Sequence, residues 1–134
     1  MIELRNLEVD FNGLVKLQVA IDKVVKKQVP LKLSYVLYKN KSIIDEVLGI
    51  HLKAIENAQI KYSEKDEDGN PIIENDSYLI AKENEKEFKE LIDKLTTKKC
   101  EFKIFTIGAE SLFEVATDTK LSCEELMDLN FMVR

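Results

Sequence analysis

The chain has 134 residues, of which 45% are hydrophobic and 34% are charged, and its formal net charge is −5. A single domain, residues 1–134, is expected, because a chain of this length can bury a core without disulfides or metals. The negative charge argues against free binding to a nucleic-acid backbone, and no apolar run approaches the roughly 18 residues of a membrane span.

The N-terminal part predicts a strand followed by an amphipathic helix. Apolar residues alternate, with one change of phase, over Ile2–Val9, which indicates a short strand. Over Phe11–Gln28 they recur at steps of three and four, so one face of a helix is apolar. Asp10 and Asn12 are both suitable N-caps for this helix.

A second, longer helix is predicted over Pro30–Ser63, where apolar residues keep helical spacing throughout. Proline suits the first turn of a helix, and a helix of this length extends for about 50 Å. Ser42 opens a capping-box pattern, which leaves the alternative that a separate helix starts there. The connection between the first two helices is short, so they are expected to be antiparallel neighbours.

The stretch EKDEDGNPIIEN, Glu64–Asn75, spaces its acidic residues like a calcium loop. Two frames fit in part, but both lack the bidentate Glu that closes such a site. Asp68–Gly69 is typical of a turn, and Asn75–Asp76 is typical of a two-residue hairpin turn between the β-prone segments Pro71–Glu74 and Ser77–Ala81. We therefore predict an acidic turn followed by a hairpin, without calcium.

The C-terminal part predicts three helices, one strand and an apolar tail. The strand is the best in the chain, because apolar and polar residues alternate along it. Ser122 and Glu125 form a capping-box pattern for the last helix. The expected elements are a helix over Glu83–Thr96, a strand over Cys100–Ile107, a helix over Ala109–Ala116, a helix from Ser122 to about Leu129 and the tail Asn130–Val133.

Together these elements predict an α+β fold. A long antiparallel helical hairpin is expected to pack with a small, mostly antiparallel sheet, and short helices follow at the C-terminus. The sheet is expected to combine the N-terminal strand, the central hairpin and Cys100–Ile107.

No residue pattern indicates catalytic, cofactor or metal chemistry. His51 is the only histidine, and Val47 and Ile55 share its helix face, so a partly buried structural role is expected. Cys100 and Cys123 are expected to be buried, reduced thiols. The chain has no Gly-rich phosphate loop and no nucleophile elbow. We therefore expect no cofactor, no metal and no enzymatic activity.

Acidic residues are concentrated in the middle of the chain, where residues 64–93 contain eleven acids against four lysines. Such a segment is suited to imitating nucleic acid and docking on a basic partner, although a solvated surface is the commoner explanation. The candidate partner-binding residues are Asp66, Asp68, Glu83, Glu87 and Glu90. If they do not bind, Phe131 and Met132 in the apolar tail are the next candidates.

Three segments, VPLKLSYVLYKNKSIIDEVLGI, KYSEKDEDGNPI and EELMDLNFMV, occur in this order, with an acidic helix and a strand between the second and the third. In this arrangement the chain resembles a family of small phage and prophage proteins of low-GC Gram-positive bacteria, known as domain of unknown function 1617. The resemblance covers about Leu14–Val133. It implies a phage origin and a cytoplasmic location in a bacterial host cell, and it implies no catalytic residue.

We therefore predict a phage or prophage accessory protein that acts by binding a host or phage protein. The preferred hypothesis is an inhibitor of a host defence or nuclease complex, whose basic nucleic-acid channel would receive the acidic segment. A virion or tail-assembly component that acts as an oligomer is the alternative. A small enzyme or ligand binder, with a site between the helix pair and the sheet, is a third.

Overall fold

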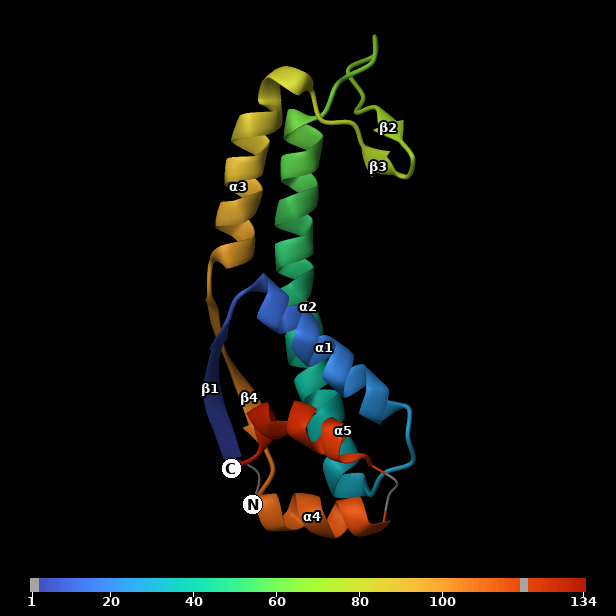
Figure 1. Cartoon of the computed structure of the whole chain (residues 1–134), viewed down its shortest axis with the longest axis vertical. Helices are drawn as coiled ribbons and strands as arrows, with labels where there is room; N and C mark the ends of the chain where they lie inside the picture. Colours follow the sequence, from blue (N-terminus) through green and yellow to red (C-terminus); the bar gives the residue numbers. More distant parts are fainter. Residues whose placement is uncertain (1–2, 119–120) are drawn as a thin grey trace. The chain divides into compact units, whose positions relative to one another are not determined.

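The computed structural model describes residues 3–118 and 121–134. The chain divides into two compact units, which are treated separately: unit 1 comprises residues up to Leu48 and Lys99–Arg134, and unit 2 comprises Gly49–Lys98. Figure 1 shows the elements in their order along the chain. They are β1 (Glu3–Val9), α1 (Phe11–Val25), α2 (Leu31–Tyr62), β2 (Ile73–Glu74), β3 (Ser77–Tyr78), η1 (Lys82–Asn84), α3 (Glu85–Thr97), β4 (Cys100–Thr106), α4 (Ala109–Asp118), α5 (Cys123–Asp128) and η2 (Asn130–Met132).

The predicted α+β class is confirmed, with a long helix, a small antiparallel sheet and short C-terminal helices. Each predicted helix and strand is present, with its ends shifted by a few residues. Ile2, the first residue of the predicted N-terminal strand, lies outside the described residues. The prediction of a single domain stays a prediction.

In unit 1, β1 and β4 form an antiparallel sheet of two strands. The register pairs Glu3 with Thr106 at one end and Val9 with Cys100 at the other. The C-terminal tail continues this sheet, because Ile107 donates its N–H to the Met132 carbonyl at 2.8 Å. The tail therefore docks beside the end of β4.

Helix α1 begins at a side-chain cap and folds back on α2. The Asp10 carboxylate accepts a hydrogen bond from the Gly13 N–H at 2.8 Å, so Asp10 is the cap. A Cβ at Gly13 would lie 2.9 Å from the Val9 Cβ, which explains a glycine in this first turn. The helix ends at Val25, earlier than the predicted Gln28. Proline disfavours helix at the residue before it, and residues 28–30 are indeed non-helical.

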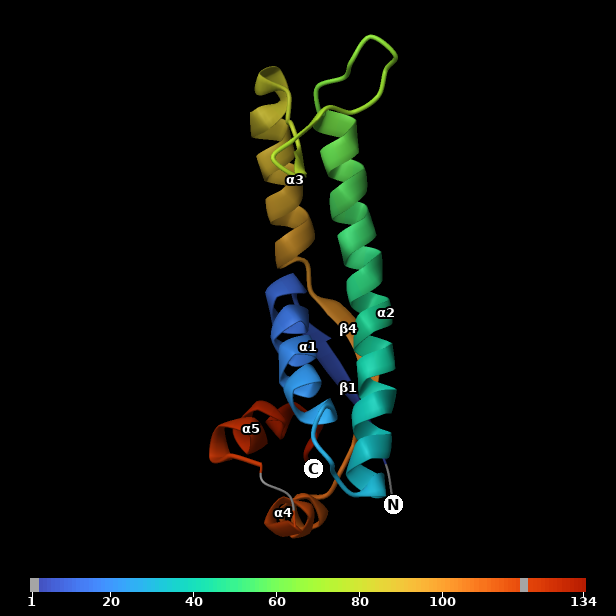
Figure 2. The same ribbon diagram turned by 90° about the vertical axis from the view of Figure 1, so that its right-hand side faces the viewer.

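The two helices are antiparallel neighbours, as predicted (Figure 2). Gln18 donates to Asp45 at 3.0 Å, and Lys41 donates to Asp22 at 2.8 Å. Residue numbers therefore rise along α1 in the direction in which they fall along α2. Helix α2 is continuous over 32 residues, which makes the alternative of a separate helix from Ser42 wrong. A break there would have rotated the buried stripe that continues past it to Ile44.

In the core of unit 1, a buried side-chain amide joins α2 to β4. Asn40 is fully buried in α2, and its side chain donates to the Phe105 carbonyl at 2.9 Å and accepts from the Phe105 N–H at 2.7 Å. Asn40 therefore pairs with the edge of β4 that faces away from β1. The surrounding apolar cluster consists of Leu14, Ile21, Val24, Leu33, Val36, Leu37, Ile44, Leu48, Ile104, Ile107, Leu112, Leu129 and Met132.

Unit 2 contains the rest of α2, the β2–β3 hairpin, η1 and α3. Asn75 and Asp76 have φ values of 54° and 64°, which confirms the predicted two-residue hairpin turn. The hairpin forms a separate sheet, so the prediction that it joins β1 and β4 is wrong. The residues that flank the hairpin instead bond to the segment that follows α2. The Glu64 N–H donates to the Leu79 carbonyl at 2.7 Å, and the Glu64 carbonyl accepts from the Ile72 N–H at 2.9 Å.

Candidate functional site

Two of the predicted binding residues lie in the acidic turn of unit 2. The Asp66 carboxylate accepts hydrogen bonds from the N–H groups of Asp68 and Asn70, both at 2.9 Å. Gly69 follows with a φ of 82°, which only glycine adopts easily. Within residues 3–118 and 121–134, no group of three His, Cys, Asp or Glu side chains is placed to hold a metal ion. Asp66 therefore shapes the turn, and the absence of calcium stays a prediction.

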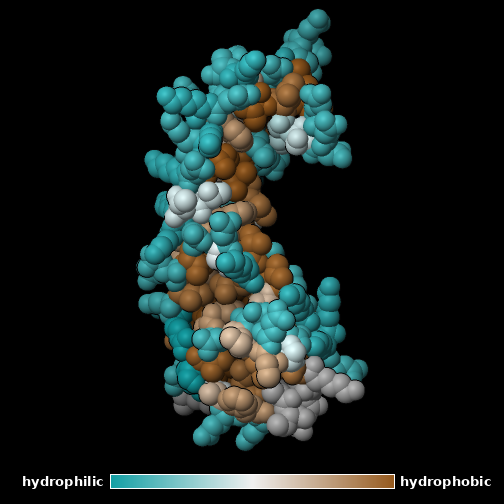
Figure 3. Space-filling model, viewed as in Figure 1, coloured by the Kyte–Doolittle hydropathy of each residue, from teal (hydrophilic) through white to brown (hydrophobic). Residues whose placement is uncertain are grey.

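The other three predicted residues do not share one helix. Glu83 lies in η1, whereas Glu87 and Glu90 lie in α3, which begins two residues later than predicted. The reason is a tight turn, in which the Asn84 N–H bonds to the Ala81 carbonyl at 2.9 Å. All three carboxylates are exposed, and the surface over α3 is mainly hydrophilic on the face in Figure 3. Their role in binding stays a prediction.

The histidine and the two cysteines differ in how deeply they are buried. His51, which was expected to be partly buried, is buried, with 8% of its surface exposed, and its structural role stays a prediction. Cys100 is half-buried in β4, and Cys123 is exposed. The prediction of buried thiols is therefore wrong for Cys123, which follows the N-cap Ser122 in the first turn of α5, and it holds only in part for Cys100.

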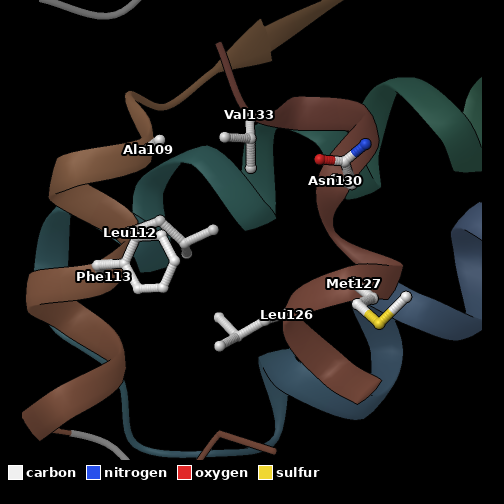
Figure 4. Close-up of a pocket in the computed structure, with 7 residues that line it drawn as sticks. All are labelled: Ala109, Leu112, Phe113, Leu126, Met127, Asn130 and Val133. Atoms are coloured by element: carbon white, nitrogen blue, oxygen red, sulfur yellow. The ribbon is translucent and has the colours of Figure 1, made fainter. Parts of the chain in front are cut away.

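An apolar groove lies in unit 1 between α4, α5 and the C-terminal tail, and its volume is about 440 Å³. Leu112 and Phe113 from α4 and Leu126 from α5 point toward the space between the two helices (Figure 4). Phe113 is 66% exposed and Met127 is 76% exposed. The lining residues are Ala109, Leu112, Phe113, Leu126, Met127, Asn130 and Val133.

The walls of this groove are fixed by polar contacts. Ser122 and Glu125 form a capping box at the start of α5, as predicted. Lys27, in the connection between α1 and α2, makes an ion pair with Glu125 at 2.5 Å. The hydrogen bond from Lys27, and then the one from the Ser122 N–H, lower the pKa of the Glu125 carboxyl below its usual value. On the other wall, Lys32 donates to the Ser111 hydroxyl at 3.1 Å.

The described lining of the groove is mainly apolar. It contains one polar side chain, Asn130, and no acid, base or nucleophile. The tail residues named as second candidates do not form the exposed surface, because Met132 is fully buried and Phe131 is half-buried.

Sequence reasoning missed Phe113 and Met127. The available signal was two pairs of adjacent apolar residues, one on each of two short helices: Leu112 with Phe113, and Leu126 with Met127. Adjacent residues on a helix lie about 100° apart, so a single core contact seldom buries both.

Comparisons with models of protein families, with curated proteins and with solved structures found no match for the chain. The resemblance to the phage family therefore stays a prediction. In the described parts of the chain, no helix has the length and apolar character needed to cross a membrane.

Proposed function

We propose that the protein acts by binding another protein, and that the apolar groove of unit 1 is the contact surface. The observation that carries this proposal is the exposure of Phe113 and Met127, at 66% and 76%, beside a groove of about 440 Å³. Apolar patches on monomeric proteins are usually small, and larger ones mark sites of interaction. Aromatic residues and methionine are also enriched at protein interfaces.

In this proposal the protein is a phage or prophage accessory protein in a bacterial cell, and its partner is a host or phage protein. An inhibitor of a host defence or nuclease complex is the preferred form. It is supported by the exposed carboxylates of Glu83, Glu87 and Glu90, which present negative charge to a basic channel. The two surfaces belong to different units, so each can be altered separately.

The test is quantitative capture of proteins from a host lysate by three forms of the full chain. They are the wild type, a groove variant (Phe113→Asp with Met127→Asp) and an acidic-surface variant (Glu83→Lys, Glu87→Lys and Glu90→Lys). All five positions are exposed, so both variants are expected to fold, as circular dichroism will check. We expect a protein that the wild type captures and the groove variant loses. Equal capture by the wild type and the groove variant would reject the proposal.

A second candidate, an assembly component that acts as an oligomer, is favoured by the outer edge of β1. Asn40 uses both backbone groups of Phe105, so the opposite residue, Leu4, directs its own backbone groups away from β4. By alternation, Asn6 and Glu8 do the same. Within the described ranges, no hydrogen bond covers this edge. An open edge can accept a strand from a second copy.

Light scattering after size exclusion tests this second candidate. In Asn6→Pro, the lost N–H faces outward, so the ladder between β1 and β4 keeps its bonds. We expect an oligomer for the wild type and a monomer for the variant if the edge assembles. A monomeric wild type would exclude it. The charges of Glu3 and Glu8 oppose edge pairing, which is why this candidate ranks second.

A further inference from the structure

We infer that the groove between α4 and α5 binds a short amphipathic helix with basic residues beside its apolar face. This inference rests on the proposed protein-binding function and specifies the segment that the partner presents. Its basis is the combination of an apolar groove with negative charge along both walls.

The two walls have matching sequences. One is ESLFE, from Glu110 to Glu114, and the other is EELMD, from Glu124 to Asp128. In each, a leucine lines the groove, and the next residue, Phe113 or Met127, is exposed. Each wall therefore presents the same order of an acid, a groove-lining leucine, an exposed apolar residue and a second acid.

Helix geometry places the acids beside the exposed apolar residues. Glu110 precedes Phe113 by three residues, and Glu124 precedes Met127 by three, so each apolar side chain has a carboxylate one turn away on its own face. The second acid of each wall follows the first by four residues and extends the same row. Glu110, Glu124 and Asp128 are all exposed. Both sides of the groove thus present negative charge to solvent.

Lysines that contact the walls offset only part of this charge, because the two walls together carry five acids: Glu110, Glu114, Glu124, Glu125 and Asp128. Lys27 is paired with Glu125, which is a further acid of the α5 wall. Lys32 donates to the Ser111 hydroxyl of α4. A partner with lysine or arginine beside its apolar anchors is therefore favoured, and an acidic partner is repelled.

The geometry favours a helix over other peptide conformations. Strand addition requires a row of unpaired backbone groups at a sheet edge, and the two principal walls of the groove are helices, which present no such edge. Polyproline recognition uses grooves lined by several aromatic rings, whereas Phe113 is the one aromatic residue in the described lining. An amphipathic helix in an apolar groove, with anchors three, four and seven residues apart, is the mode that remains.

The first experiment selects binders from a displayed library of helical peptides with randomised surface positions, using the full chain as target. The enriched peptides are then measured against the groove variant and against Ile50→Asp with Leu52→Asp. Ile50 and Leu52 are exposed apolar residues of unit 2, so this matched control introduces the same chemical change elsewhere. We expect net-positive peptides with helically spaced apolar anchors, bound normally by the control and at least about tenfold more weakly by the groove variant.

The second experiment tests the charge. Glu110→Gln, Glu124→Gln and Asp128→Asn together remove three charges with little change in shape. We expect affinity for the selected peptides to fall about tenfold at low salt, with most of the difference lost at high salt.

Several outcomes would overturn the inference. The selection would do so if the enriched peptides were neutral or acidic, or if no helical peptide were enriched over background. Equal binding of the peptides by the wild type and the groove variant would also do so. A wild-type dimer that Phe113→Asp dissociates would make a second copy of the chain the occupant of the groove. Lysate capture separates this inference from the proposed function. If capture requires the groove but the peptides are not basic, the function stands and the inference fails. If capture does not require the groove, the function itself fails.

Discussion

Unit 1 and unit 2 differ in what holds them together, although α2 contributes to both. In unit 1, large apolar side chains such as Leu33, Leu37 and Ile44 are completely buried. In unit 2, the buried apolar residues of the described chain are Ala58 and Ala81, and α3 buries none of its side chains fully. A long regular helix therefore does not imply uniform stability along its length.

The difference follows from the residues that each part of α2 presents to its neighbours. Through Leu48 the inward stripe consists mainly of large aliphatic side chains. Beyond it, the stripe continues with His51 and Ala58, which bury less apolar area. Helix α3 is held partly by an edge contact between Phe88 and Tyr62, whose ring centres lie 6.2 Å apart. Unit 2 is therefore expected to open locally before unit 1 unfolds.

The largest expected effect is in hydrogen exchange. Amides of α3 are expected to exchange through local opening, and those of β4 and the first part of α2 through global unfolding. We expect protection in unit 2 to be lower by roughly two orders of magnitude or more. Mass spectrometry of peptides from each unit measures this. Equal protection in both units would show that they unfold together, in support of the single domain predicted from the sequence.

A matched pair of substitutions in α2 measures the same contrast energetically. Ile44 is fully buried in unit 1, and Ile55 is half-buried in unit 2. Ile44→Ala is expected to lower the free energy of unfolding by about 2–5 kcal/mol. Ile55→Ala is expected to cost about 1 kcal/mol. Denaturant unfolding gives both values, and an equal cost would contradict the contrast in packing.

The sequence predicts most of the elements but not how the sheets combine. Periodicity located α2 and β4, and turn chemistry located Asn75–Asp76, because these signals are local. Sheet membership is not local, and nothing in the hairpin sequence showed that it bonds to the stretch after α2. The pairing of Asn40 with Phe105 was also invisible, since it joins residues 65 positions apart.

The buried pairing of Asn40 with Phe105 leads to the next prediction. Asn40→Ala leaves the N–H and the carbonyl of Phe105 without their side-chain partner. We expect a loss on the order of 2–4 kcal/mol, because each buried polar group without a partner costs about 1–3 kcal/mol. Asn57→Ala is the matched control, since Asn57 is exposed in the unit 2 part of the same helix and its loss is expected to stay within about 0.5 kcal/mol. Similar costs for the two variants would mean that the amide pair contributes little.

The groove was hidden from sequence reasoning for a related reason. The acidic segment is conspicuous because its charges are contiguous, whereas Phe113 and Met127 stand among residues that periodicity assigns to buried faces. Which of two adjacent apolar residues stays exposed depends on how α4 and α5 pack, and this information is tertiary.

The smallest expected effect concerns pH and the α5 wall of the groove. The pKa of Glu125 is lowered in the folded chain, chiefly by the hydrogen bond from Lys27. A lowered pKa contributes stability above the unfolded value of 4.5, and that contribution is lost as pH falls through the folded pKa. Glu125→Gln keeps a side chain that suits the capping box but lacks the charge. At neutral pH the wild type is expected to be more stable than this variant by at most about 1 kcal/mol, because the Lys27 side chain is 39% exposed.

Thermal unfolding of the wild type and Glu125→Gln between pH 7 and pH 3 checks this sign. The gap is expected to close below pH 4.5, where the carboxylate of the wild type becomes protonated. A gap that stays constant over this range would show that the ion pair with Lys27 contributes nothing to folding. The α5 wall would then be held by the capping box and by the burial of Leu129, which follows the helix and is completely enclosed.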